Sequence, residues 1–254
     1  MCIRDRYLIG VSIASLVKLY PVAFTTAWMR FAFDSMRRAD APLLFGRLSS
    51  YAFAVLSFLT LALACFAQPV VELMTPNAFH ASAQVVPLLA LGMAIQSTST
   101  LLSTSINVAK RTHVYPIATA LAAVVSVGGY LMLIPLWGLF GAAASVVAGQ
   151  VVFVLTLGYF AQRYFAIHYE WRRLWTAAGV AIALYGIMVI AAPAPIAAAL
   201  GVGLALLAMY PVALVVLGFF KAQELQEIRQ LLASLRDSVV AGKRVSSTPD
   251  ESEK

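Results

Sequence analysis

Lys18 is a charged residue deep inside a long apolar stretch, residues 7–33. An ionisable group at the centre of a membrane-crossing helix costs about 2.5–3.5 kcal/mol on insertion scales, so it usually faces water or a partner. Pro21 follows three residues later, and because proline has no N–H, the helix is expected to kink there. We expect Lys18 to face a hydrated cavity and to contact an anionic solute. The alternative is a lysine satisfied by a neighbouring helix or extended to the interface.

A second polar feature is a stripe of hydroxyl and amide side chains in residues 83–107. The spacing of its members, i, i+4, i+7, i+8 and i+11, places them on one face of a helix. They are Gln96, Thr100, Ser103, Thr104 and Asn107. The stripe suits contacts to a hydrated solute, but Ser and Thr also join helices to each other, and the residues leave both interpretations open. Gln150 lies near the middle of the stretch 139–162 and is expected to face the same cavity.

Small residues recur every four positions at the start of the stretch 139–162. Gly141, Ser145 and Gly149 form the small-xxx-small pattern that allows two helix backbones to approach closely. We expect these three residues to pack against a neighbouring helix.

Residues suited to catalysis or metal binding are sparse. The apolar stretches contain no Asp, Glu or His, and His80, His113 and His168 fall in three different loops or loop edges. The sequence has neither a P-loop nor a GxGxxG motif. We therefore expect no catalytic site, no metal and no cofactor, and we do not expect an enzyme.

The elements that position these residues are apolar stretches long enough to cross a bilayer, which takes about 20 residues. The chain of 254 residues is 61% hydrophobic and 11% charged, whereas soluble domains are about 25% charged. These values predict an all-α polytopic membrane protein with about seven transmembrane helices. The predicted spans are 7–33, 48–68, 83–107, 114–136, 139–162, 173–193 and 196–220.

Basic residues alternate between the predicted connections, which predicts one orientation. The connections near Arg37, Lys110 and Arg163 and the C-terminal tail are basic, and those between them contain no Lys or Arg. By the positive-inside rule the basic connections and the C-terminus are cytoplasmic, and the first span enters from outside. The net charge of +7 therefore reflects topology, and no nucleic-acid partner is expected.

The two ends of the chain differ from the spans. Residues 1–6 have the character of a non-native remnant, and we expect the natural chain to begin earlier. Residues 221–242 carry apolar side chains at helical spacing with charges on the other face. They are expected to form an amphipathic helix on the inner membrane surface or a partner-binding helix. Residues 243–254 are expected to be disordered.

Three segments carry a resemblance to a family. Residues 133–144 read LIPLWGLFGAAA, and the segments 102–112 and 82–92 resemble the helix ends that precede such a turn. The pattern resembles polysaccharide flippases of the multidrug/oligosaccharidyl-lipid/polysaccharide exporter superfamily. At 107–108 the chain has Asn-Val where those proteins commonly have a glycine.

The resemblance implies a fourteen-helix, two-lobe transporter, of which this chain would be the C-terminal portion. Residues 7–165 would be an incomplete C-terminal lobe, and residues 166–220 two peripheral helices. The implied function is flipping a polyprenyl-diphosphate-linked oligosaccharide across the bacterial inner membrane by alternating access, for cell-surface polysaccharide or lipopolysaccharide biosynthesis. The implied partners are this lipid-linked oligosaccharide, membrane lipids, and polysaccharide polymerase or glycosyltransferase machinery.

Other functions remain as alternatives. A cation-coupled multidrug exporter of the same superfamily is expected to carry acidic residues inside the membrane, and the predicted spans have none. A retinal protein needs a lysine in a late span beside a carboxylate, whereas Lys18 lies in the first. A membrane scaffold without transport activity is the third alternative, with the residues 221–242 as its docking element.

Overall fold

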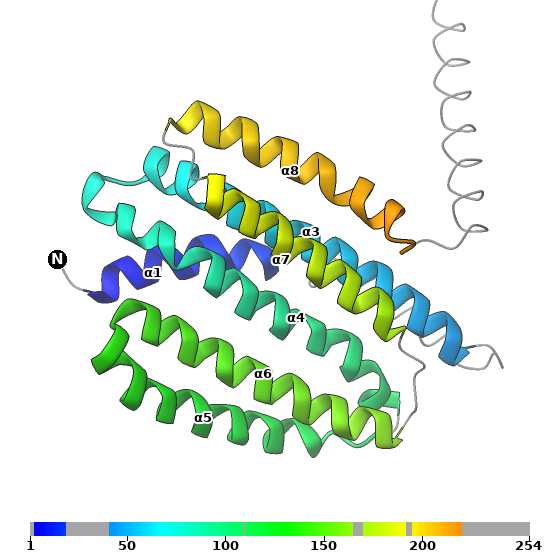
Figure 1. Cartoon of the computed structure of the whole chain (residues 1–254). Coiled ribbons are helices and arrows are strands. Elements are labelled where there is room, and N and C mark those ends of the chain that lie inside the picture. Colours follow the sequence, from blue (N-terminus) through cyan, green and yellow to red (C-terminus); the bar gives the residue numbers. More distant parts are fainter. Residues whose placement is uncertain (1–2, 19–40, 109, 165–169, 192–194, 220–254) are drawn as a thin grey trace, which may run out of the picture.

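The computed structural model describes residues 3–18, 41–108, 110–164, 170–191 and 195–219, and in these ranges every regular element is helical (Figure 1). The α-helices are α1 (Ile3–Ala14), α3 (Ala41–Met74), α4 (Val86–Val108), α5 (Val114–Trp137), α6 (Leu139–Tyr164), α7 (Trp171–Ala191) and α8 (Ile196–Val216). Two 3₁₀ segments, η1 (Ser15–Lys18) and η2 (Asn77–Gln84), follow α1 and α3.

Five of these helices are long and apolar enough to cross a membrane, and they confirm the prediction of an all-α multi-pass membrane protein. The five spans are Phe45–Met74, Val114–Trp137, Leu139–Arg163, Trp171–Ala191 and Ile196–Val216. Helix α4 has 23 residues, about 34 Å at 1.5 Å per residue, but it also carries the polar stripe. Of the predicted first span, the structure describes only the apolar helical segment Tyr7–Lys18. Pro21 and the segments 221–242 and 243–254 lie outside the described residues.

Two helices extend beyond the ranges expected from hydropathy. Helix α1 begins at Ile3, so it includes part of the segment 1–6. Helix α3 has 34 residues and continues through Pro69 to Met74, well past the predicted end at residue 68. Proline is tolerated in membrane helices because neighbouring groups and small local adjustments satisfy the freed backbone carbonyl.

The helices form a layered bundle in the order α5, α6, α4, α3, with α7 and α8 packed on α3 and on each other (Figure 1). Helix α1 packs against α4 and η2. Helices α5 and α6 are joined by a tight turn at Gly138, which has φ +53° and whose N–H donates to the carbonyl of Ile134 at 2.8 Å. Helix α7 packs on α3 rather than on α6, although α6 precedes it in the chain.

The apolar contacts fall into separate clusters on the two sides of the bundle. On one side Leu61 and Cys65 of α3 pack with Leu184 of α7 and Leu206 of α8. A second cluster joins α1 to α3 and α4, and a third joins α4 to α5 and α6. Helices α3 and α4 thus connect two bodies that each have their own packed interior.

A buried arginine holds the basic ends of α3, α7 and α8 together. Arg173 of α7 is 6% exposed, and its Nε lies 2.8 Å from Glu170 Oε2. This contact with Glu170 is an ion pair, and the guanidinium carbon of Arg173 lies 5.7 Å from the ring centroid of Tyr51 on α3 and 5.5 Å from that of Phe219, after α8. In the sequence, Arg173 contributes only to the prediction of orientation. In the structure it is buried and packs against side chains from two other parts of the chain.

Candidate functional site

The polar stripe of α4 is partly satisfied within its own helix and partly from α5. Ser103 Oγ donates to the carbonyl of Thr100 at 2.7 Å. Tyr115 of α5 donates from its hydroxyl to Asn107 Oδ1 at 3.0 Å and lies 3.4 Å from the carbonyl oxygen of Ser103. Gln96, Thr100, Ser103 and Asn107 are all half-buried. The stripe is thus a partly accessible row whose C-terminal end, at Asn107, is bound by Tyr115.

Gln150 lies at about the level of Gln96. Helices α4 and α6 run parallel, because Gly92 lies against Val147 and Leu102 against Gly158. Gln96 follows Gly92 by four residues and Gln150 follows Val147 by three. The two half-buried amides are therefore at matching depths on neighbouring helices.

Lys18 is exposed at the end of η1, whereas the preceding Val17 is buried. Val17 packs in the cluster that includes Leu56 of α3 and Leu89 of α4. Within the described ranges no hydrogen bond links Lys18 to the stripe, so the structure does not join the lysine to the amides directly. Its predicted contact with an anionic solute stays a prediction.

Gly141, Ser145 and Gly149 line the contact between α6 and α5. A Cβ built at Gly141 would overlap the Leu133 carbonyl, and one at Gly149 would overlap the Ser126 hydroxyl. Ser145 is buried, and its Oγ donates to the carbonyl of Gly141 at 2.7 Å. These small side chains lie where the two backbones approach most closely.

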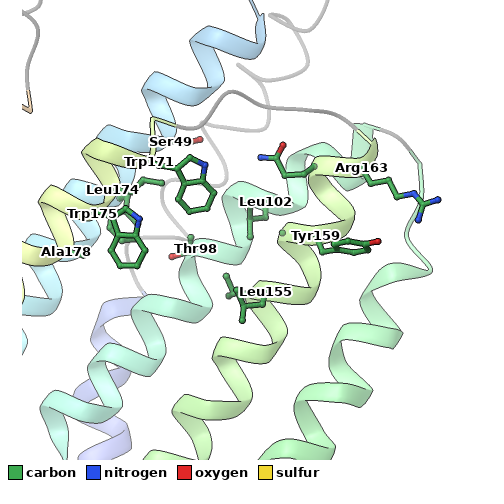
Figure 2. Close-up of a pocket in the computed structure, with 14 residues that line it drawn as sticks. Ser49, Thr98, Leu102, Leu155, Tyr159, Arg163, Trp171, Leu174, Trp175 and Ala178 are labelled. Carbon is green, nitrogen blue, oxygen red and sulfur yellow. The ribbon is translucent and has the colours of Figure 1, made fainter.

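The structure also contains a long groove that the sequence analysis did not predict. It lies between α6 and α7, and α3 and α4 form its floor (Figure 2). Two adjoining cavities of about 810 Å³ and about 600 Å³ share Phe53, Thr98, Val154 and Ala178, so they form one continuous space. The groove exists because α7 packs on α3, and among the described residues no helix covers the facing side of α6.

One end of the groove, near the α6–α7 connection, is polar and aromatic. It is lined by Ser49, Gln162 and Arg163 together with exposed aromatic rings. Figure 2 shows Trp171 and Trp175 on one side and Tyr159 and Leu155 on the other. The sequence feature that could have indicated this site is the aromatic residues at the ends of two predicted spans, because such rings concentrate at membrane interfaces.

The groove and the polar stripe use different faces of α4. The groove contacts Leu91, Ile95, Thr98 and Leu102. At about 100° per residue, the stripe is centred roughly 150° away around the helix. The polar stripe and the apolar groove therefore lie on opposite sides of α4.

No protein-family model, no curated protein and no solved structure matches this chain. The described residues also contain no group of three or more His, Cys, Asp or Glu side chains that could hold a metal ion.

Proposed function

We propose that this chain takes part in flipping a polyprenyl-diphosphate-linked oligosaccharide across the bacterial inner membrane by alternating access. The observation that carries the proposal is the polar stripe of α4, with Gln150 of α6 at the level of Gln96. A row of half-buried amides and hydroxyls inside a membrane bundle is costly unless water or a polar solute reaches it.

The chemistry of the proposed substrate matches this separation of surfaces. Sugar hydroxyls both donate and accept hydrogen bonds, as do the amides of Gln96, Asn107 and Gln150. A diphosphate needs a cation, and Lys18 is exposed at the end of η1. The hydrocarbon carrier can remain in lipid. The substrate crosses the membrane without a bond being made or broken, so the proposal requires no catalytic group.

The sequence resemblance adds the biological setting. The segment 133–144, which resembles the turn of polysaccharide flippases, forms the end of α5, the Gly138 turn and the start of α6. In this setting the chain would act in the assembly of cell-surface polysaccharide. Glycosyltransferases would supply its substrate, and a polymerase would use the flipped oligosaccharide.

Export in a bacterial strain that lacks its lipid-linked oligosaccharide flippase tests the proposal. The complete gene that encodes this chain is expressed, and surface glycan is measured by lectin binding while membrane insertion is checked by immunoblotting. We expect export with the wild-type gene, a loss with Lys18→Ala and retention with Lys18→Arg. Thr119→Val, at an exposed position of α5, is the matched control.

One result would contradict the proposed function, and another would contradict only the role of Lys18. A wild-type protein that inserts normally but restores no export of any lipid-linked glycan contradicts the function itself. Normal export with Lys18→Ala removes the lysine from the mechanism but leaves the stripe as the site.

A further inference from the structure

We propose that the groove between α6 and α7 binds an anionic phospholipid from the leaflet at the basic end of the bundle. Its acyl chain lies on the floor formed by α3 and α4, and its phosphate lies at the rim near Arg163, at the end of the bundle that also carries Arg47 and Arg172. This inference does not depend on the transport proposal, because it concerns the apolar side of α4 and a lipid that stays in place.

The length and lining of the groove fit a hydrocarbon chain. The groove follows α3 from Ser49 to Ala64, about 22 Å at 1.5 Å per residue. Half of a hydrocarbon core of about 30 Å is shorter than this, so one acyl chain fits along it. Phe53, Val154 and Ala178 line its middle section. Because an unfilled apolar space forfeits dispersion contacts, a chain from the bilayer is its natural occupant.

Positive charge is concentrated at one end of the groove only. Arg163 lines that end, Arg47 precedes Ser49 by two residues, and Arg172 follows Trp171. All three arginines are exposed and come from three different helices. In Figure 2 Arg163 extends away from the two tryptophans, so its guanidinium lies outside the apolar part of the groove. Basic pockets between membrane helices are typical sites for anionic headgroups.

The surrounding charges reinforce this asymmetry. Glu170, the acidic residue nearest to Trp171 in the described ranges, forms an ion pair with Arg173. At the other end the groove reaches Gln84, and the chain has neither Lys nor Arg from residue 48 to residue 109. An anionic headgroup is therefore attracted to one end and not to the other.

Aromatic side chains mark the level at which the headgroup would lie. Trp171 is 61% exposed and Trp175 is 71% exposed, and both line the groove. Indole rings favour the headgroup level of a bilayer, since they combine an apolar face with an N–H donor. A purely apolar occupant, such as a helix of another protein, would leave this polar rim unused.

The two tryptophans provide a direct test by fluorescence quenching. A variant with Trp28→Phe and Trp137→Phe keeps only Trp171 and Trp175. It is placed in nanodiscs of phosphatidylcholine that contain a small fraction of phosphatidylglycerol or phosphatidylcholine brominated on the acyl chains. We expect the brominated phosphatidylglycerol to quench several-fold more strongly at equal mole fraction. A variant that keeps only Trp137 should show no such preference.

Matched substitutions separate the rim from general surface charge. Because each arginine near the surface attracts anionic lipid, Arg163→Gln with Arg172→Gln should abolish most of this several-fold preference. Lys110→Gln with Arg111→Gln removes two charges from another connection and should leave it unchanged. Gly158→Leu fills the groove and should reduce quenching, whereas Gly179→Leu, at an exposed position on α7, should not.

Two outcomes would overturn the proposal. Equal quenching by both brominated lipids means that the groove holds bulk lipid without selection. Weak quenching by both, unchanged in Gly158→Leu, means that protein rather than lipid fills the groove. Neither outcome bears on glycan export, which depends on the opposite face of α4.

Discussion

The hydroxyl of Tyr210 on α8 donates a hydrogen bond to the backbone carbonyl of Ala54 on α3, 3.1 Å away and 156 residues earlier in the chain. Both residues are buried, and the Tyr210 ring lies 5.7 Å from the ring of Phe58. The carbonyl of Ala54 accepts this bond from outside its own helix. A polar contact of this kind holds α8 on α3 at one position along an otherwise apolar surface.

Tyr210→Phe should lower the free energy of unfolding by about 0.6 kcal/mol and by no more than about 1.7, the range for hydrogen bonds between membrane helices. The ring and its packing remain, so the loss reports the hydroxyl alone. Reversible unfolding in mixed micelles measures it. Tyr159→Phe, at an exposed position, is the control, and an equal loss in both variants would disprove the role assigned to the bond.

Arg173→Ala should lower the free energy of unfolding by about 1–3 kcal/mol, because it leaves the partly buried Glu170 carboxylate without its ion pair and removes two ring contacts. Arg172→Ala provides an adjacent control, since Arg172 is exposed. Arg173→Lys should recover only part of the loss, because an ammonium lacks the planar guanidinium. Thermal unfolding of the three variants in one detergent would show the order, and equal melting temperatures would contradict it.

Gly149→Ala should destabilise the α5–α6 pair by about 1–3 kcal/mol, because the new Cβ would overlap the Ser126 hydroxyl. Ser126→Ala should recover part of this loss when the two substitutions are combined. Gly128→Ala is the control, since nothing lies within 4 Å of a Cβ built there. Additive effects of Gly149→Ala and Ser126→Ala in a double-mutant cycle would show that the two side chains do not meet.

The matching depths of Gln96 and Gln150 predict coupled effects on transport. If both amides bind the same part of one glycan, Gln96→Leu and Gln150→Leu should each reduce export. The double variant should then be less impaired than the product of the two effects, because residues that share a partner are not additive. Export rates in the flippase-deficient strain measure this, and strict independence would place the amides at separate contacts.

Hydropathy and charge predicted the helical class and most helix positions, because a bilayer demands long apolar helices with satisfied backbones. The end of α3 was missed at Pro69. Proline normally marks a boundary, but this helix continues to Met74. The turn at Gly138 was placed near its observed position, since only glycine adopts φ +53° without strain.

The site was predictable only in part. The spacing of Gln96, Thr100, Ser103 and Asn107 places them on one helical face whatever the fold. The groove depends instead on which helices become neighbours, and hydropathy does not distinguish one apolar face from another. Nothing in the pattern of α7 indicates that Ala177 and Leu184 pack on α3 rather than on α6.

Helices α7 and α8 rest on α3 and not on α6, so the width of the groove follows the angle between α3 and α4. Because a thicker or thinner bilayer changes the tilt of membrane helices, a tilt of α3 relative to α4 would change the width of the groove. The proposed binding of a lipid in the groove should therefore depend on the thickness of the membrane around the protein.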